Sequence, residues 1–193
     1  EHILGAGTSL AAQEVEVTLM FVDVRGFTTL AERLRPTEVV ATLNRLFERI
    51  VPVVHREGGH VDSFAGDGLM AVFGAPRRQA FHADRALAAA LQISDAVHDE
   101  FGASLSVGIG LNSGPVVAGN VGGDGRLQFS VVGDAVNVAA RVETATRVTG
   151  DKVLLTERTM DLLTGEYGEF VRRPGIPLKG KTEPVAIYVP AAS

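Results

Sequence analysis

The 193-residue sequence contains no cysteine and no tryptophan, and only 6% of its residues are aromatic. Without cysteine, neither a disulfide framework nor a thiolate metal site can form. No apolar run reaches the ~20 residues that a membrane-spanning helix needs, so we expect no membrane contact by this chain. Eighteen Lys and Arg against 23 Asp and Glu leave a net charge of −5. This balance argues against a nucleic-acid-binding surface.

Two common catalytic motifs are also missing. The sequence has no GxxxxGK[ST] segment, which excludes a P-loop nucleotide site. It has no nucleophile elbow for a catalytic serine. The five histidines show no metal-ligand spacing, so we interpret them as surface or structural residues: His2, His55, His60, His82 and His98.

The hydrophobic share of 46% excludes a disordered chain, and the length fits one domain. Residues 1–14 are mostly small and lack a strong period, which predicts a linker remnant before a single domain at 15–193. The chain starts at Glu1 without Met and shows no signal peptide. We therefore expect a cytoplasmic piece of a longer protein, whose full length could carry a membrane anchor or a sensor domain.

The first hundred residues alternate between strand and helix patterns. The apolar run Val17–Val22 predicts a buried strand, and the helical period from Pro36 to about Glu57 predicts an amphipathic helix. Gly66-Asp67-Gly68 separates two short strand-like stretches, as a hairpin turn does. The predicted elements are a strand at 17–22, helices at 28–34 and 36–57, strands at 61–65 and 69–73, a helix at 83–101 and a strand at 104–111. This order is that of a ferredoxin-like βαββαβ core, with helices on one face of the sheet.

The remaining residues predict a C-terminal αβ extension of this α+β fold. Its longest element is a helix from Asp134 to about Thr149. The other predicted elements are strands at 116–121, 127–132, 153–155 and 185–189.

Two carboxylates fall where neighbouring strands of this fold end. Asp23 follows the first strand and Asp67 lies on the hairpin turn, so both can meet at one edge of the sheet. Paired hard oxygen ligands suit Mg²⁺ or Mn²⁺. The backbone of Gly26, Phe27 and Thr28, at a helix start, offers N–H groups for phosphate oxygens. The alternative is structural: Asp23 caps a helix and Asp67 only makes a turn.

A second candidate group lies on the C-terminal helix. Asn137 and Arg141 are four residues apart and therefore share one helix face. An arginine held in this way can stabilise charge on a phosphate. Near the end, Leu178–Lys181 (LKGK) places two cations around a glycine. The residues alone also allow structural interpretations: Asn137 and Arg141 could form an exposed polar helix face, and Leu178–Lys181 could form a solvated turn.

Four segments, taken together and in this order, resemble the catalytic domain of class III adenylyl and guanylyl cyclases. Phe21–Thr28 (FVDVRGFT) is similar to the first metal-binding motif of that family, and Phe64–Asp67 (FAGD) to the second. Gly133–Arg141 (GDAVNVAAR) is similar to its transition-state segment, and Leu178–Lys181 to its triphosphate segment. The resemblance covers roughly Glu14–Val189, which is nearly the whole chain.

The resemblance implies a two-metal reaction that converts ATP into 3′,5′-cyclic AMP and pyrophosphate for intracellular signalling. Asp23 and Asp67, with help from the carbonyl of Val24, would hold two Mg²⁺ or Mn²⁺ ions per site. Arg141 would stabilise the charge on the α-phosphate, and Asn137 would position the ribose.

In this family the metals and the Asn/Arg pair come from different subunits. The resemblance therefore implies a head-to-tail homodimer with two equivalent, shared sites. Lys179 or Lys181 would bind the terminal phosphates.

Three positions depart from the family pattern. Four residues before Asp67 the family usually has a purine-reading Lys, and this chain has Ser63. Ser130 stands where adenylyl cyclases often have Asp, and Ser106 where some relatives have a phosphate-binding Arg. A serine hydroxyl both donates and accepts, so relaxed selection between ATP and GTP is one alternative. We expect ATP, because neither purine position has the Glu that is typical of guanylyl relatives.

Two further alternatives concern the class of protein. The departure at Ser63 is compatible with a nucleotide-binding regulatory domain of weak or no activity. A diguanylate cyclase shares the strand order but would carry a Gly-Gly-Asp/Glu-Glu-Phe motif on the central hairpin. The hairpin here reads Ala-Gly-Asp-Gly-Leu, which argues against that class.

Overall fold

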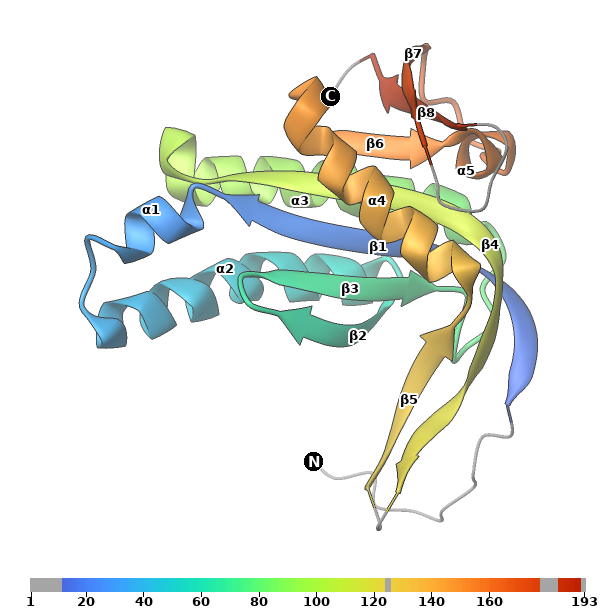
Figure 1. Cartoon of the computed structure of the whole chain (residues 1–193), viewed down its shortest axis with the longest axis horizontal. Coiled ribbons are helices and arrows are strands. Elements are labelled where there is room, and N and C mark those ends of the chain that lie inside the picture. The colour runs from blue at the N-terminus through green and yellow to red at the C-terminus, as the bar shows by residue number, and fades with distance from the viewer. Residues whose placement is uncertain (1–11, 124–125, 178–183, 192–193) are drawn as a thin grey trace.

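The computed structural model describes residues 12–123, 126–177 and 184–191, and it forms one mixed sheet with helices on both faces (Figure 1). The strand order is β2-β3-β1-β4-β6-β8-β7, and β5 pairs with β4 off this path. The strands are β1 (Gln13–Arg25), β2 (His60–Ala65), β3 (Gly68–Phe73), β4 (Ser106–Gly123), β5 (Arg126–Val132), β6 (Val153–Thr156), β7 (Phe170–Ile176) and β8 (Val185–Pro190). The helices are α1 (Phe27–Ala31), α2 (Pro36–Arg56), α3 (His82–Phe101), α4 (Asp134–Thr149) and α5 (Glu157–Asp161), with a 3₁₀ turn at Gly102–Ser104.

The order of elements confirms the predicted ferredoxin-like core with its αβ extension. The helices α2 and α3 cover one face of the sheet, as expected. The extension helix α4 crosses the opposite face, over β1 and β4 (Figure 1). The sheet is therefore enclosed between two layers of helix.

Strand β1 contributes side chains to the hydrophobic clusters on both faces of the sheet, because its successive side chains point to opposite faces. Met20 and Val22 point into the cluster shared with α2 and α3. Val17 and Leu19 point into a second cluster, where Ala135 of α4 packs. By the same alternation, Asp23 lies on the α4 face of β1.

Strand β4 corrects the predicted break between residues 111 and 116. The segment Asn112–Pro115 (NSGP) has the composition of a turn, yet it continues one 18-residue strand. Its pairing with β1 runs unbroken from Arg25 opposite Ser106 to Gln13 opposite Ala118. This long antiparallel register holds the strand through residues that locally favour a turn.

Three further differences concern element bounds. Strand β1 begins at Gln13, so the last two residues of the predicted linker belong to the sheet. Helix α1 spans Phe27–Ala31 and is shorter than predicted. Helix α5 and strand β7 were not predicted from the sequence.

Candidate active site

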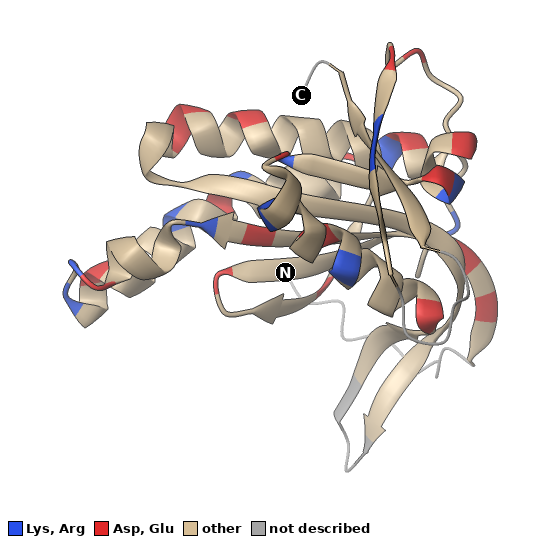
Figure 2. Cartoon of the chain, turned by 45° about the horizontal axis from the view of Figure 1, so that its top comes forward, with Lys and Arg blue, Asp and Glu red and all other residues tan. Residues whose placement is uncertain are grey.

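The two predicted metal ligands lie next to each other at one edge of the sheet. Strands β1 and β3 are antiparallel neighbours, with Val22 opposite Leu69. A Cβ atom placed on Gly68 would lie 3.5 Å from the Cα of Asp23, so Asp67, one residue earlier, lies beside Asp23. Acidic positions colour the β2–β3 turn in Figure 2. The structure therefore brings the predicted carboxylate pair together, as the sequence analysis expects.

The surroundings of Asp67 disfavour its negative charge. Partial burial raises the pKa of the Asp67 carboxyl, and the nearby charge of Asp23 adds to this effect. Burial and Asp23 likewise raise the pKa of Glu143, on the facing side of α4. One carboxyl oxygen of Glu143 is buried without a hydrogen-bond partner in the described part of the chain. Three carboxyl groups therefore gather at this edge, and the charges of Arg147 and Arg25 offset their repulsion in part. A divalent cation would neutralise the carboxylates further.

One cation, Arg147, reaches this edge from the last turn of α4. Its guanidinium Nη2 lies 2.6 Å from Oδ2 of Asp23. The hydrogen bond to Asp23 raises the pKa of Arg147. Sequence analysis did not identify Arg147, because the contact joins residues that are 124 positions apart. The one sequence feature that could have identified Arg147 is its position on the same predicted helix, six residues beyond Arg141.

These residues fit a divalent metal ion in chemistry and placement. Asp23 of β1 and Asp67 of the β2–β3 turn supply hard oxygen donors. Val24 has an aliphatic side chain, buried in the core, so its backbone carbonyl is the group of that residue that could ligate a metal. No group of three or more His, Cys, Asp or Glu side chains suited to a metal ion occurs in the residues that the structure describes. A metal bound here would therefore need further oxygen ligands, such as phosphate oxygens or water.

The predicted phosphate-binding turn follows Asp23, and a glycine conformation fixes its shape. Gly26 adopts a left-handed conformation with φ of 86° and precedes the first residue of α1. A Cβ on Gly26 would lie 2.8 Å from the carbonyl oxygen of Ser104, so only glycine fits this close approach. Phe27 anchors the turn in the core, whereas Thr28 is exposed. The anchored turn therefore holds Gly26, Phe27 and Thr28 directly after the strand that carries Asp23.

Asn137 and Arg141 are exposed and lie on one face of α4, as predicted. Arg141 lines a cavity of about 650 Å³ between α4 and the β7–β8 region, together with Val148, Ile176 and Ile187. Pro177 also lines this cavity. The predicted triphosphate segment, with Lys179 and Lys181, follows Pro177 in the sequence and lies outside the described residues.

Within one chain, the Asn/Arg pair does not face the carboxylate pair. Arg141 precedes Arg147 by six residues, so the two side chains diverge by about 120° around the helix axis. Arg147 is the one that contacts Asp23. Asn137 is ten residues from Arg147, a distance of about 15 Å along the helix. One chain therefore presents two half-sites that point in different directions.

The two candidate purine-recognition serines lie on strands that meet at the sheet end. The side-chain amide of Gln128 in β5 donates to the backbone carbonyl of Asp62 in β2, at 2.9 Å. Ser63 follows Asp62 and is exposed, and Ser130 lies two residues from Gln128 on the same face of β5. Phe129 of β5 also stacks edge-on with a β2 histidine, at 5.3 Å between ring centres. The geometry thus places both serines near one β2–β5 contact.

Fold and site geometry together define a nucleotide cyclase domain, and comparison with known proteins agrees. The profile of the adenylate and guanylate cyclase catalytic domain matches residues 10–190. The chain therefore belongs to this family.

The relatives include both adenylyl and guanylyl cyclases. The adenylate cyclase of Anabaena cylindrica is 34% identical, in an alignment that covers 92% of this chain and 37% of that protein. The crystal structure of the guanylyl cyclase Cya2 matches with a TM-score of 0.82 and 33% identity, covering 92% of both chains. The adenylyl cyclase CyaB from P. aeruginosa matches with a TM-score of 0.82 and 28% identity, covering 93% of this chain and 95% of that chain.

The chain spans about a third of the length of the curated relatives that it matches. In the described residues, no helix is both long and apolar enough to cross a membrane.

Proposed function

We propose that this domain is an adenylate cyclase, which converts ATP into 3′,5′-cyclic AMP and pyrophosphate at sites shared by two copies of the chain. The observation that carries the proposal is the division of the site within one chain. Asp23 and Asp67 meet at one sheet edge, while Arg141 points away from them on α4. Two chains in head-to-tail contact would unite both halves twice, at two equivalent sites.

In the proposed site, each half performs a different task. Asp23, Asp67 and the Val24 carbonyl would hold Mg²⁺ or Mn²⁺, which supply Lewis-acid activation of the ribose 3′-oxygen and neutralise phosphate charge. The N–H groups of the Gly26–Thr28 turn would donate to phosphate oxygens. The 3′-oxygen then bonds to the α-phosphorus, its proton passes to solvent, and the bond to the β-phosphate oxygen breaks.

The partner chain would supply the polar groups that recognise the reacting nucleotide. Arg141 would stabilise the charge that develops on the α-phosphate, and Asn137 would orient the ribose. Lys179 would bind the terminal phosphates of the leaving pyrophosphate. Asn137 and Arg141 lie on α4, so a single chain can deliver this pair, whereas Lys179 lies outside the described residues.

A dimer is supported by apolar side chains exposed on the β4–β5 hairpin, which projects from the main sheet (Figure 1). Val117 and Val132 are direct cross-strand partners and are 48% and 62% exposed. Val121 on the same face is 55% exposed, and Phe64 of β2 is 56% exposed. These residues lie at the end of the sheet where Ser63 and Ser130 are placed. A second copy that covered them would also close the site.

The choice of ATP rests on Ser63 and Ser130. Neither is the Glu that the family resemblance associates with guanine, and two of the relatives described above are named adenylate or adenylyl cyclases. A serine at an exposed position imposes little selection, however, because its hydroxyl donates and accepts. Relaxed use of ATP and GTP is therefore the second candidate function. It is supported by the similarity to a structure named a guanylyl cyclase.

The test is product formation by the purified chain with Mn²⁺ and either ATP or GTP, separated by chromatography. Cyclic AMP from ATP, with little product from GTP, supports adenylate cyclase activity. Similar amounts of both cyclic nucleotides support the relaxed site. If neither appears at concentrations that permit dimerisation, the result contradicts the proposal and supports the alternative of a nucleotide-binding regulatory module.

A further inference from the structure

Helix α4 lies unusually close to β4, because β4 turns glycines toward it. A Cβ on Gly110 would lie 2.1 Å from the backbone nitrogen of Glu143 and 2.8 Å from the carbonyl oxygen of Ala139. A Cβ on Gly114 would lie 3.1 Å from the Cβ of Ala135. Backbone therefore rests directly on backbone along this crossing. Against β4 the helix therefore has few interlocking side chains that would resist sliding or rotation. The larger buried side chains of α4, Val138 and Val142, pack instead with Leu154 of β6 and Ile187 of β8.

Asn112 is the side chain that interrupts this row of glycines. It lies between Gly110 and Gly114 on the same face of β4 and is 5% exposed. Its Nδ2 donates to the carbonyl oxygen of Ala135, in the first turn of α4, at 2.9 Å. Its Oδ1 accepts from the hydroxyl of Thr156, also at 2.9 Å. Both ends of the amide are thus satisfied, which fixes its orientation.

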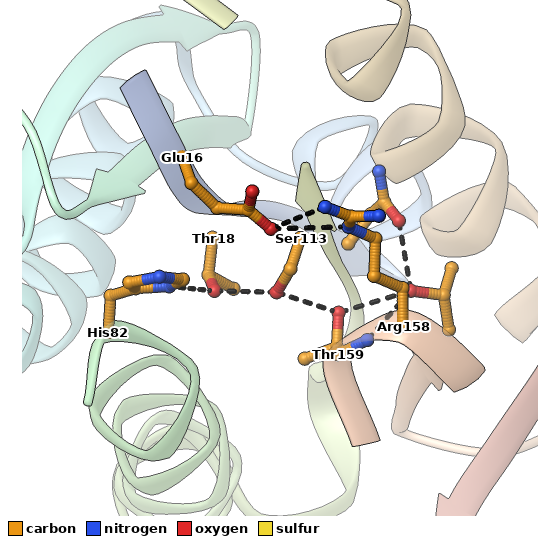
Figure 3. A network of polar contacts seen from close by, with 8 residues as sticks. Glu16, Thr18, His82, Ser113, Arg158 and Thr159 are labelled. Atoms are coloured by element: carbon orange, nitrogen blue, oxygen red, sulfur yellow. Dashed lines mark hydrogen bonds and ion pairs between the residues drawn. The ribbon is translucent and has the colours of Figure 1, made fainter. Parts of the chain in front are cut away.

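The partner Thr156 is itself held by a chain of buried hydroxyls, part of which Figure 3 shows. Thr156 contacts Thr159 at 3.1 Å, and Thr159 accepts from Ser113 at 3.1 Å. Ser113 contacts Thr18 of β1 at 2.7 Å, and Thr18 contacts Nδ1 of His82 at 2.8 Å. The amide of Asn112 is therefore connected through β1 to the start of α3. Buried networks in which every member is paired are rigid.

We propose that Asn112 is a positioning residue, which fixes the place of α4 on β4 and so sets where Asn137 and Arg141 meet the substrate. The hydrogen-bonded carbonyl of Ala135 is two residues from Asn137 and six from Arg141. A displacement of about 1 Å at groups that align a reacting substrate can cost roughly 10²-fold in rate. This inference rests on the proposed function, because it assigns Asn137 and Arg141 to the reaction.

Mixed dimers provide a test that separates positioning from general stability. A chain with Asp23→Ala and a chain with Arg141→Ala should each be inactive alone. Mixed, they form one working site, in which the Asp23→Ala chain supplies α4 and the Arg141→Ala chain supplies the carboxylates. We expect Asn112→Ala to lower the activity at least about tenfold when it is placed in the Asp23→Ala chain. Placed in the Arg141→Ala chain, whose α4 is not used, it should change the activity less than about twofold.

Two further variants calibrate this result. Thr156→Val removes the hydroxyl that donates to Oδ1 of Asn112, but the Nδ2 of Asn112 can still donate to the Ala135 carbonyl. We therefore expect a smaller loss of activity than for Asn112→Ala, again only when the substitution is in the Asp23→Ala chain. Thr146→Val is the matched control, because Thr146 is a fully buried residue of α4 whose hydroxyl bonds within the helix, to the Glu143 carbonyl at 2.6 Å. It should lower the activity of neither mixed dimer. Equal losses from Asn112→Ala in either chain, or no loss, would overturn the proposal.

A second readout needs no activity. Hydrogen exchange of the amides at Val138 and Ala139 should be faster in Asn112→Ala than in Thr146→Val, because the first turn of α4 loses its link to β4. If the parent pair of Asp23→Ala and Arg141→Ala chains does not complement, the shared-site proposal fails. Hydrogen exchange then still tests whether Asn112 holds α4 on β4. Unchanged protection of Val138 and Ala139 in Asn112→Ala would show that it does not.

Discussion

The face of the sheet under α2 and α3 is closed by large aliphatic side chains, whereas the face under α4 combines aliphatic side chains with close contacts between the helix and strand glycines. On the first face, Ile50 of α2 and Leu87 of α3 are fully buried against strand side chains such as Ile109. On the second, Ala139 of α4 lies directly over Gly110. Both faces bury aliphatic side chains, and the α4 face adds a backbone contact at Gly110 of β4.

This difference separates stability from site geometry. Burying a large aliphatic side chain removes apolar surface from water, which stabilises the fold by about 1.5–3 kcal/mol per residue. Contact between backbones buries less apolar surface and has few interlocking side chains to fix the position of a helix. Helix α4 carries the proposed catalytic residues Asn137 and Arg141, so its face is the one where small displacements matter.

Removal of Arg141 should have the largest effect on activity and almost none on folding. We expect Arg141→Ala to lower kcat by about 10²–10³-fold, because the charge on the α-phosphate loses a fixed partner. Arg141 is exposed, so the free energy of unfolding should change little. Steady-state kinetics and urea unfolding measure the two quantities. Arg35→Ala is the control, an exposed arginine that pairs with Glu38 on α2. A kcat near that of the wild type for Arg141→Ala would remove Arg141 from the reaction.

The opposite pattern is expected on the α2–α3 face. Ile50→Ala should lower the free energy of unfolding by about 2–5 kcal/mol, because it leaves a cavity in a close-packed core. The fraction that remains folded should keep most of its activity. Val40→Ala, at a 57% exposed position of the same helix, should cost little. Denaturant unfolding of both variants is the measurement, and equal losses would mean that this face does not carry the stability.

The regular part of the first face could be predicted from the sequence. The helical period over α2 and the apolar run of β1 each reflect the surface that they bury, so both elements were found. Strand β1 nevertheless extends to Gln13 and Arg25, beyond the predicted 17–22, so Asp23 lies within it. The Gly-Asp-Gly turn placed Asp67 beside Asp23, because strand order follows from the predicted core. In this part of the fold, the structure that the local sequence favours is the same one that strand pairing requires.

The α4 face could not be predicted in the same way. Glycines at alternate positions of β4 look like turn residues until the helix that they accommodate is known. The contact of Arg147 with Asp23 depends on the angle at which α4 crosses the sheet, which no local pattern encodes. Strand β7 was missed because it is an edge strand that pairs with β8 alone on the strand path. Its two arginines, proline and glycine hide any alternation.

Gly110→Ala should lower both the activity and the free energy of unfolding, which Arg141→Ala and Ile50→Ala change separately. Its new methyl group would lie within 2.8 Å of three backbone atoms of α4, so the whole helix has to move. Overpacking of this kind costs about 1–3 kcal/mol, and the displaced Asn137 and Arg141 should lower kcat as well. Gly114→Ala is the graded comparison, because its methyl group would meet a single side-chain atom at 3.1 Å. If Gly110→Ala is as active and as stable as wild type, α4 is not held tightly on β4.

The smallest effect is expected from an ion pair just after α4, where Arg173 of β7 donates two hydrogen bonds of 2.8 Å to Asp151. These bonds lower the pKa of the Asp151 carboxyl below its ordinary value. A lowered pKa in the folded state stabilises the protein above the unfolded pKa of about 3.9, and this contribution is lost as the pH falls through the folded value.

Arg173→Gln should therefore reduce stability slightly at pH 7, by less than Gly110→Ala does, and by progressively less below pH ~4. Urea unfolding of both proteins between pH 7 and pH 3 measures this convergence. Ile50→Ala is the reference, because its loss involves no titrating group and should persist as the pH falls. A difference between wild type and Arg173→Gln that stayed constant with pH would show that Asp151 is not the partner that matters. The polar α4 side of the molecule should thus respond to acid through this pair, whereas the aliphatic α2–α3 face should not.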